Sequence, residues 1–437
     1  MGPIPFLEKK IRALSLDDYE IYRVERRHLT AEARDGEIDS LDEAVERGVA
    51  VRLFRGGKCG FACASDGPDP FLERMLDLAY NSLSVVEAGD LFNLPIGVSG
   101  IQGILPSTES KAEKLGMALE LERVAIGFDR RITRVRDASY SEEVTTVTLR
   151  NSRGLEKTHS GCRYGLSLMV MAEDKGSQEM AWDSEQATEF SALNASRVAG
   201  RTSEKAVAQL GGRVVKTQKT AAVLDPMVAA SILGVLASSF FGDQVQKNRS
   251  PLRNRKGEDI YSRQVTLVDD GSLPGGYASS PFDGEGTPTM RSELIVEGVL
   301  KGFLHDLGSA VKERTEGTGN GVRPNFKETP RVGATNFFIE QGRGTLKDLL
   351  GEMGTGFWIR DVIGVHTADP VTGDFSLGAS GQWVEEGDGK FPVRGVTISG
   401  NLHEILKRVV RVGGESRFYR SFGSPPLLID SIDVGGI

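Results

Sequence analysis

The chain has 437 residues and a formal net charge of −8, from 53 Lys and Arg against 61 Asp and Glu. This balance argues against direct nucleic-acid binding, because proteins that bind nucleic acids usually present a basic face. Its most apolar segment, residues 226–241, is too short to span a bilayer and no secretion signal is recognised, so we expect a cytoplasmic protein that is not embedded in a membrane. Three cysteines, at positions 59, 63 and 162, are too few for a disulfide framework and fit a reducing compartment.

The first predicted domain, residues 1–85, combines an antiparallel meander with two helices. A helix near residues 6–14 precedes a series of strand-like segments at 19–26, 29–35, 37–45, 48–54 and 58–64. Short segments of this kind, joined by glycine-containing turns, are typical of antiparallel hairpins. Asp69-Pro70 then begins a helix whose apolar residues recur at helical spacing, so one of its faces should pack on the sheet.

Residues 86–106 show little periodicity and are predicted to link the first domain to a middle domain, residues 106–212. The middle domain begins and ends with a helix, and the elements expected in chain order are a helix at 108–130, strands at 132–149, 155–160, 163–172 and 178–182, and a helix at 192–210. Helices on both sides of a run of strands favour an α+β arrangement.

The third predicted domain, residues 219–437, is rich in glycine and in short strand-like segments, which indicates a β-rich domain. It opens with a helix, because Asp225 suits the N-cap and Pro226 suits the first helical position. Residues 227–241 are apolar or small on nearly all sides, so this helix should be buried. A short, interrupted basic run at 249–256 could form a local patch. The whole chain is therefore expected to have an α+β fold.

Four phrases in the third domain resemble sequences of the TldD/PmbA family, which carries the older label of DNA gyrase modulator. In chain order they are Thr318-Gly-Asn-Gly, Pro330-Arg-Val-Gly-Ala-Thr-Asn-Phe-Phe-Ile-Glu, Val371-Thr-Gly-Asp-Phe-Ser-Leu-Gly-Ala-Ser-Gly and Val396-Thr-Ile-Ser-Gly-Asn-Leu. Each phrase alone is weak, whereas the ordered set is specific, and the predicted meander and middle domain also fit. The chain is therefore identified as a member of this family.

The resemblance implies a zinc protease built from two homologous subunits. The catalytic, TldD-type subunit carries a His-Glu-x-x-x-His motif on the helix that opens the third domain, and a cysteine ligand further on. Two histidines one turn apart can bind Zn²⁺, and the glutamate between them activates the zinc-bound water. In this chain the corresponding helix, Asp225–Gly242, contains no histidine, and no cysteine follows Cys162. The chain therefore resembles the PmbA/TldE-type subunit, whose members lack zinc.

On this interpretation the chain has no catalytic residue, metal or cofactor of its own, and zinc is expected in a TldD-type partner. The resemblance implies a heterodimer that acts on unfolded or precursor peptides, with a homodimer possible when the chain is alone. Whether the chain is an enzyme in its own right stays open. Two alternatives also stay open: a regulatory subunit that binds another protein without proteolysis, and an active peptidase with an unrecognised metal site.

One histidine begins a sequence that looks like a zinc-protease motif. After His403-Glu404 a second ligand would fall at position 407 or 408, where the chain has Lys407 and Arg408. A cation there would repel Zn²⁺, so we interpret His403-Glu404 as part of a solvated helix face. The other histidines have no ligand spacing and are interpreted as structural: His28, His159, His305 and His366.

Two glycine-rich segments are candidates for a peptide groove or a subunit contact. Residues 315–321 lack the preceding strand and the following helix that a phosphate-binding loop needs, so a mobile loop at a subunit contact or substrate opening is expected. Residues 373–381 lie between strand-like segments and could offer backbone groups to a peptide. The candidate residues are Thr318, Gly319, Asn320, Ser376, Ser380 and Asn401.

Overall fold

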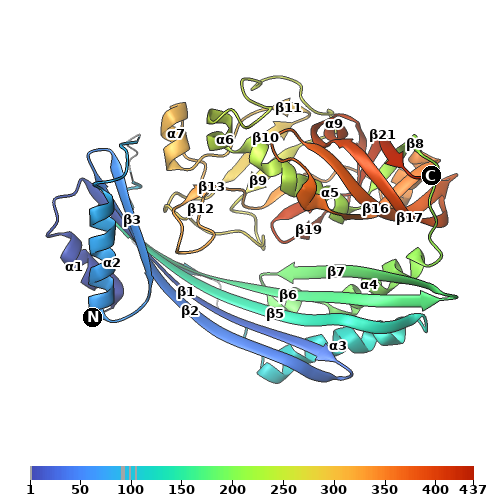
Figure 1. Ribbon diagram of the computed structural model, residues 1–437, viewed down its shortest axis with the longest axis horizontal. Coiled ribbons are helices and arrows are strands. Elements are labelled where there is room, and N and C mark those ends of the chain that lie inside the picture. Colours follow the sequence, from blue (N-terminus) through green and yellow to red (C-terminus); the bar gives the residue numbers. More distant parts are fainter. Residues whose placement is uncertain (1, 90–93, 98–99, 104–105) are drawn as a thin grey trace.

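The computed structural model describes residues 2–89, 94–97, 100–103 and 106–437. Long strands of the N-terminal half form one curved, seven-stranded sheet (Figure 1), and each pairs antiparallel with its neighbours except β4, which runs parallel to β6. The strand order is β3-β2-β1-β5-β6-β4, and β7 also pairs with β6. The strands are β1 (Asp18–Arg34), β2 (Glu37–Arg55), β3 (Lys58–Ser65), β4 (Gly100–Gly103), β5 (Ile132–Asn151), β6 (Glu156–Asp174) and β7 (Ser177–Ala187).

The sheet corrects the predicted strand boundaries in the meander. The segments 19–26 and 29–35 belong to a single strand, β1, and the segments 37–45 and 48–54 form a single strand, β2. The two strands stay in register through Arg27 and Val45. Near these residues polar side chains interrupt the alternation of apolar and polar positions, because both faces of the sheet are partly accessible. The interruption therefore does not mark the end of a strand. One sheet thus spans the first two predicted domains. The predicted linker 86–106 lies partly outside the described residues.

Among the described residues, four α-helices accompany this sheet. They are α1 (Pro3–Ile11), α2 (Asp69–Ser82), α3 (Lys111–Phe128) and α4 (Ala195–Gln209). Helices α3 and α4 pack on each other and on β5 and β6, where they cover the end of the sheet that holds the turn between β1 and β2. Helix α3 lies on the opposite side of the sheet from the C-terminal domain (Figure 1). The other face of the sheet therefore faces the C-terminal domain.

The C-terminal domain contains two six-stranded sheets and a short β12–β13 pair. The first sheet has the order β17-β16-β15-β8-β21-β18, with β8 (Gln218–Leu224), β15 (Gly356–Ile363), β16 (Asp374–Glu385), β17 (Asp388–Asn401), β18 (Val409–Val412) and β21 (Leu427–Gly435). The second has the order β11-β10-β9-β14-β20-β19, with β9 (Leu267–Asp270), β10 (Arg291–Val296), β11 (Val299–Leu300), β14 (Phe337–Ile339), β19 (Arg417–Tyr419) and β20 (Phe422–Ser424). The short pair is β12 (Gly321–Val322) and β13 (Arg331–Val332).

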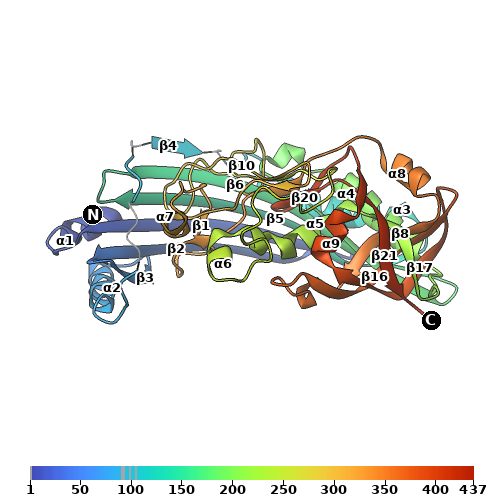
Figure 2. The ribbon, with the colours of Figure 1, turned by 90° about the horizontal axis from the view of Figure 1, so that it is seen from above.

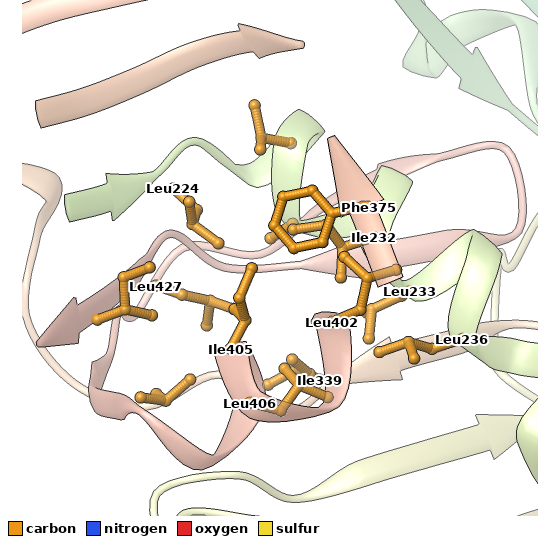
Figure 3. Packing of buried hydrophobic residues seen from close by; sticks show 14 of the residues in the cluster. Leu224, Ile232, Leu233, Leu236, Ile339, Phe375, Leu402, Ile405, Leu406 and Leu427 are labelled. Atoms are coloured by element: carbon orange, nitrogen blue, oxygen red, sulfur yellow. The ribbon is translucent and has the colours of Figure 1, made fainter. Parts of the chain in front are cut away.

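Helix α5 (Pro226–Leu236) lies in the core between these two sheets. Figure 3 shows its residues Ile232, Leu233 and Leu236 among buried side chains that come from strands of the domain and from α9 (Leu402–Lys407). The predicted N-cap is confirmed, because the Asp225 carboxylate accepts a hydrogen bond from the backbone N–H of Met227. The remaining helices are α6 (Gly242–Gln246), α7 (Leu307–Glu313) and α8 (Leu346–Met353). The predicted α+β fold is thus confirmed.

A buried cluster of charges joins the large sheet to the C-terminal domain. Arg52 of β2 contacts Glu20 of β1 at 2.6 Å and Glu285 of the C-terminal domain at 3.0 Å. Arg323, also from the C-terminal domain, pairs with Glu20 as well. All four side chains are at most 5% exposed. Charges buried to this extent are stable only when paired, so the cluster fixes how the sheet and the domain meet.

Within the described residues no helix is both long enough and apolar enough to cross a membrane.

Candidate functional site

A cavity of about 890 Å³ lies between the large sheet and the C-terminal domain. Successive side chains of a strand point to opposite faces, and the contacts of Glu20 and Tyr22 with Arg323 show that even-numbered residues of β1 face the C-terminal domain. We call the cavity on this face the inner groove. Its sheet side is formed by polar and aromatic side chains, including Arg26, His28, Thr30, Glu46, Ser141, Glu143, Arg163, Ser167, Trp182, Ser184 and Gln186.

On the sheet side of the inner groove the charged residues lie in ion pairs. Glu143 lies 3.3 Å from Arg26 and 3.0 Å from Arg163, and Arg26 also approaches Glu46 at 3.5 Å. His28 contacts the Asp42 carboxylate at 3.0 Å. Because these charges neutralise one another, the groove has little net charge with which to favour a positively or a negatively charged ligand. The groove is therefore polar without being strongly acidic or basic.

The opposite side of the groove is formed by the C-terminal domain through Tyr277, Tyr419 and Arg420. Arg163 donates to the Tyr277 carbonyl oxygen at 2.9 Å, and its guanidinium lies 5.1 Å from the centre of the Tyr277 ring. The Tyr419 hydroxyl is buried and has no hydrogen-bond partner among the described residues. Burial also raises its pKa, with the nearby Asp183 carboxylate adding to the shift.

Trp182 adds an indole ring to the lining of the groove. It belongs to β7, is 38% exposed, and donates through Nε1 to the Ser167 hydroxyl at 3.0 Å. A ring fixed by this hydrogen bond can pack on a ligand without losing much rotational freedom. The inner groove thus combines a fixed aromatic ring, hydroxyl groups and paired charges along a strand surface, which suits an extended polypeptide.

The groove residues were not predicted from the sequence, where only His28 was singled out and interpreted as structural. One signal was present: in the middle of β1, β5 and β6 polar residues occupy both alternating sets of positions. A sheet that buries one face should alternate apolar and polar residues. Loss of that alternation in the middle of a long sheet indicates a second, accessible face.

The resemblance described above puts the zinc motif of a catalytic subunit on the helix that corresponds to α5. Its partly accessible side carries Met227, Ser231 and Val235, and none of its residues from Pro226 to Leu236 is a histidine. The Ser231 hydroxyl donates to the Met227 carbonyl oxygen at 2.8 Å and so is engaged with the helix itself. Over the described part of the chain, no group of three or more His, Cys, Asp or Glu residues is arranged to hold a metal ion.

His403 is buried, which corrects its interpretation as part of a solvated face. It is 8% exposed because α9 turns this residue and its leucines into the core, while Glu404 and Lys407 remain exposed. Its Nδ1 lies 2.7 Å from the Tyr261 hydroxyl, and the two rings stack. Burial, aided by the positive charge of Lys407, lowers the pKa of His403 to about 4. The residue is therefore a neutral core histidine at pH 7.

The six candidate residues lie apart from the inner groove. Asn320 is buried and donates to Asp269 at 2.7 Å, and the Thr318 hydroxyl in turn donates to the side-chain amide oxygen Oδ1 of Asn320. Gly319 has φ +74°, and a Cβ there would lie 2.5 Å from the Pro288 carbonyl oxygen. On the other segment, Ser376 and Ser380 belong to β16, and Asn401 caps α9 by accepting from the His403 and Glu404 amides. The structure thus places the six candidates in two separate regions, and their role in peptide or subunit contact stays a prediction.

Comparison with known proteins gives concordant matches along the chain. Family models for the PmbA/TldA metallopeptidases match residues 19–82 as domain 1, residues 104–210 as the central domain and residues 217–436 as the C-terminal domain. Metalloprotease PmbA from Escherichia coli O157:H7 is 26% identical, over 93% of this chain and 90% of its own length. A metalloprotease TldD homolog from Haemophilus influenzae is also 26% identical, over 92% and 89% of the two chains.

Solved structures share the fold over nearly the whole length. A protein from Thermotoga maritima MSB8, described as a modulator of a DNA gyrase, superposes with a TM-score of 0.89 at 26% identity and covers 99% of both chains. TldE from Thermococcus kodakarensis superposes with a TM-score of 0.88 at 22% identity, again over 99% of both chains. The second likeness concerns the fold alone.

Proposed function

Because this chain belongs to the PmbA/TldD metallopeptidase family and is a peptidase-like protein, we propose that it is the zinc-free subunit of a two-subunit metalloprotease. Identity does not separate the two branches, since the PmbA and TldD relatives are both 26% identical. The observation that carries the proposal is that α5 contains no histidine, although the resemblance puts both histidine ligands of a catalytic subunit on this helix. In this proposal zinc and its activated water belong to a TldD-type partner.

The inner groove supplies this subunit's part of the work. Its hydroxyls and paired charges can hydrogen-bond to a peptide backbone, and Trp182 can pack on a side chain. Because the Arg and Glu residues of the groove neutralise each other, binding should depend little on the charge of the peptide. This favours unfolded or precursor peptides as substrates. A cytoplasmic location is part of the proposal and is supported by the three free cysteines.

Co-purification with a TldD-type subunit tests the assignment. We expect a stable complex that contains about one zinc ion and that cleaves an unfolded peptide only when both subunits are present. A chelator should abolish the cleavage activity, and added Zn²⁺ should restore it. The purified chain alone should carry no stoichiometric zinc. Stoichiometric zinc in the chain alone would instead favour the alternative of an unrecognised metal site. A stable complex without cleavage would favour a regulatory subunit.

The contribution of the groove is tested with Trp182→Ala in the reconstituted complex. Loss of a buried aromatic contact typically weakens binding by about tenfold, so KM should rise by that factor while kcat changes little. The matched control is Met180→Ala, on the same strand and 61% exposed but outside the groove. If both variants leave KM unchanged, the inner groove does not bind the substrate.

A further inference from the structure

A second cavity, of about 770 Å³, lies beside α6 and α7. These helices are on the part of the C-terminal domain that points away from the large sheet (Figure 1), and they remain uncovered when the molecule is seen from above (Figure 2). The cavity wall comes from four segments that are distant in sequence: the end of α6, residues 253–256, residues 302–305 and the end of α7 with the residues after it. We call this cavity the outer pocket. The proposed peptidase role does not use it.

The outer pocket is lined mainly by positive charges. Arg253, Lys256, Lys312 and Arg314 contribute four cations, against the single carboxylate of Glu313. The chain as a whole has a net charge of −8, so this cavity differs in sign from the rest of the molecule. Two of the four cations come from the basic run at 249–256 that stands out in the sequence.

Three of these cations have no protein partner. The side chains of Arg253, Lys256 and Arg314 make no hydrogen bond or ion pair with any residue that the structure describes. Neighbouring basic residues behave differently: Arg255 pairs with Glu258 at 2.8 Å, and Lys247 pairs with Asp243 at 2.8 Å. Unpaired cations are common on protein surfaces, but here they gather around one concavity, where their potentials add.

The floor of the pocket is ordered by packing. His305 is 5% exposed, and its Nδ1 lies 3.3 Å from the Ser309 hydroxyl. A Cβ at Gly242 would lie 2.3 Å from that same nitrogen, so α6 packs directly against the ring. Gln246 donates to the Ser309 carbonyl oxygen at 2.7 Å and ties α6 to α7. The pocket therefore has a fixed floor beneath a rim of free cations.

From this arrangement we propose that the outer pocket binds a small anion that carries several phosphate groups. A chain of phosphates places several negative charges within the span of such a cavity, and arginine matches their oxygens with paired N–H donors. The hydroxyl of Thr315, which also lines the pocket, is a further donor. Phe303 offers an aromatic surface on which a nucleoside could lie. An acidic peptide fits less well, because turns and helix ends line the pocket and provide no strand edge for a peptide backbone.

Isothermal titration of the full-length chain tests the proposal with inorganic tripolyphosphate and with ATP as probes. We expect saturable binding of at least one of them at a single site. Equal affinities would mean that the phosphate chain alone is recognised, whereas tighter binding of ATP would mean that the nucleoside contributes. Neither measurement needs a partner subunit or peptidase activity, so the outcome is independent of the proposed function.

The decisive comparison uses two double variants that remove equal charge. Arg253→Gln with Lys256→Gln should weaken binding at least tenfold, since each charge-assisted contact contributes roughly that factor. The control, Arg249→Gln with Lys301→Gln, removes two exposed cations nearby but outside the pocket and should change affinity less than about twofold. All four side chains are exposed, so both variants should fold, and unchanged thermal unfolding would verify this.

Three results would overturn the proposal. The first is equal weakening by the two double variants, which would indicate a diffuse surface potential in place of a site. The second is the absence of saturable binding for both tripolyphosphate and ATP. The third is binding of a poly-glutamate peptide or duplex DNA while neither phosphate probe binds, which would assign the pocket to a macromolecule.

Discussion

Asp269 shows how a single buried residue organises a loop that its local sequence describes poorly. Its carboxylate accepts hydrogen bonds from Asn320, from the Thr335 amide and from the Thr335 hydroxyl, all at 2.7–2.8 Å. The sequence predicts a glycine-rich loop over residues 315–321, and Gly319 within it adopts a positive φ. The sequence could not predict that Asn320 would be buried, because its partner lies 51 residues earlier in the chain.

The same carboxylate should make stability depend on pH. Burial raises the pKa of Asp269 from 3.8 to about 6, and the hydrogen bonds that it accepts offset this only in part. Between these values the folded chain keeps a proton that the unfolded chain has lost, so raising the pH through this window lowers the free energy of unfolding. A shift of about 2 units corresponds to roughly 3 kcal/mol.

We therefore expect Asp269→Asn to flatten the pH profile of stability. Relative to the wild-type chain, the variant should gain roughly 3 kcal/mol between pH 3.5 and pH 7 in urea unfolding, whatever its stability at one pH. Asp388→Asn, at the exposed start of β17, is the matched control and should reproduce the wild-type slope. An Asp269→Asn profile parallel to the wild type would show that this carboxyl does not titrate in the window.

At the scale of elements, the sequence predicts helix starts better than element ends. Asp225 and Pro226 mark the start of α5 as the structure has it, because capping is a local interaction. The predicted end at residue 241 is wrong: α5 stops at Leu236, and a 3-10 turn over Ala237–Phe240 follows. The apolar sequence continues through the helix and the 3-10 turn, so the composition does not indicate where the helix ends. Packing between the two sheets decides that.

The environment of α5 gives opposite expectations for two adjacent substitutions. Leu233 is 1% exposed in the core, so Leu233→Ala should lower the free energy of unfolding by about 2–5 kcal/mol. Gly234 is exposed, and a Cβ there would meet only Phe422 at 3.9 Å, an ordinary contact. Gly234→Ala should therefore raise stability by up to about 1 kcal/mol through helix propensity. Thermal and urea unfolding would measure both, and a loss of stability in Gly234→Ala would contradict the exposed placement.

At the scale of the whole molecule, the relation between the large sheet and the C-terminal domain is the feature that the sequence leaves undetermined. The cluster that joins them pairs Arg52 with Glu285, 233 positions away, and Arg323 with Glu20, 303 positions away. No periodicity or spacing relates such residues. The inner groove lies between the same two parts of the molecule, so the geometry of the proposed peptide site depends on contacts that only the three-dimensional structure reveals.

Arg52→Gln tests whether this cluster holds the two parts together. The substitution leaves Glu285 buried without its cation and Glu20 with one cation in place of two, and breaking a buried pair in this way typically costs about 3–5 kcal/mol. The control is Arg47→Gln on the same strand, whose side chain is 49% exposed and pairs with Glu25 at the surface, where the expected cost is at most about 1 kcal/mol. Urea unfolding measures both costs.

Adding Glu285→Gln to Arg52→Gln separates the loss of the pair from other effects of the substitution. Removing the orphaned carboxylate should restore part of the stability, so the double variant should be more stable than Arg52→Gln alone. Because the groove is formed across this junction, Arg52→Gln should also weaken peptide binding in the reconstituted complex, although Arg52 does not line the groove. An Arg52→Gln chain as stable as the Arg47→Gln control would mean that apolar packing around Tyr22, Phe282 and Phe326 holds the junction without help from the charges.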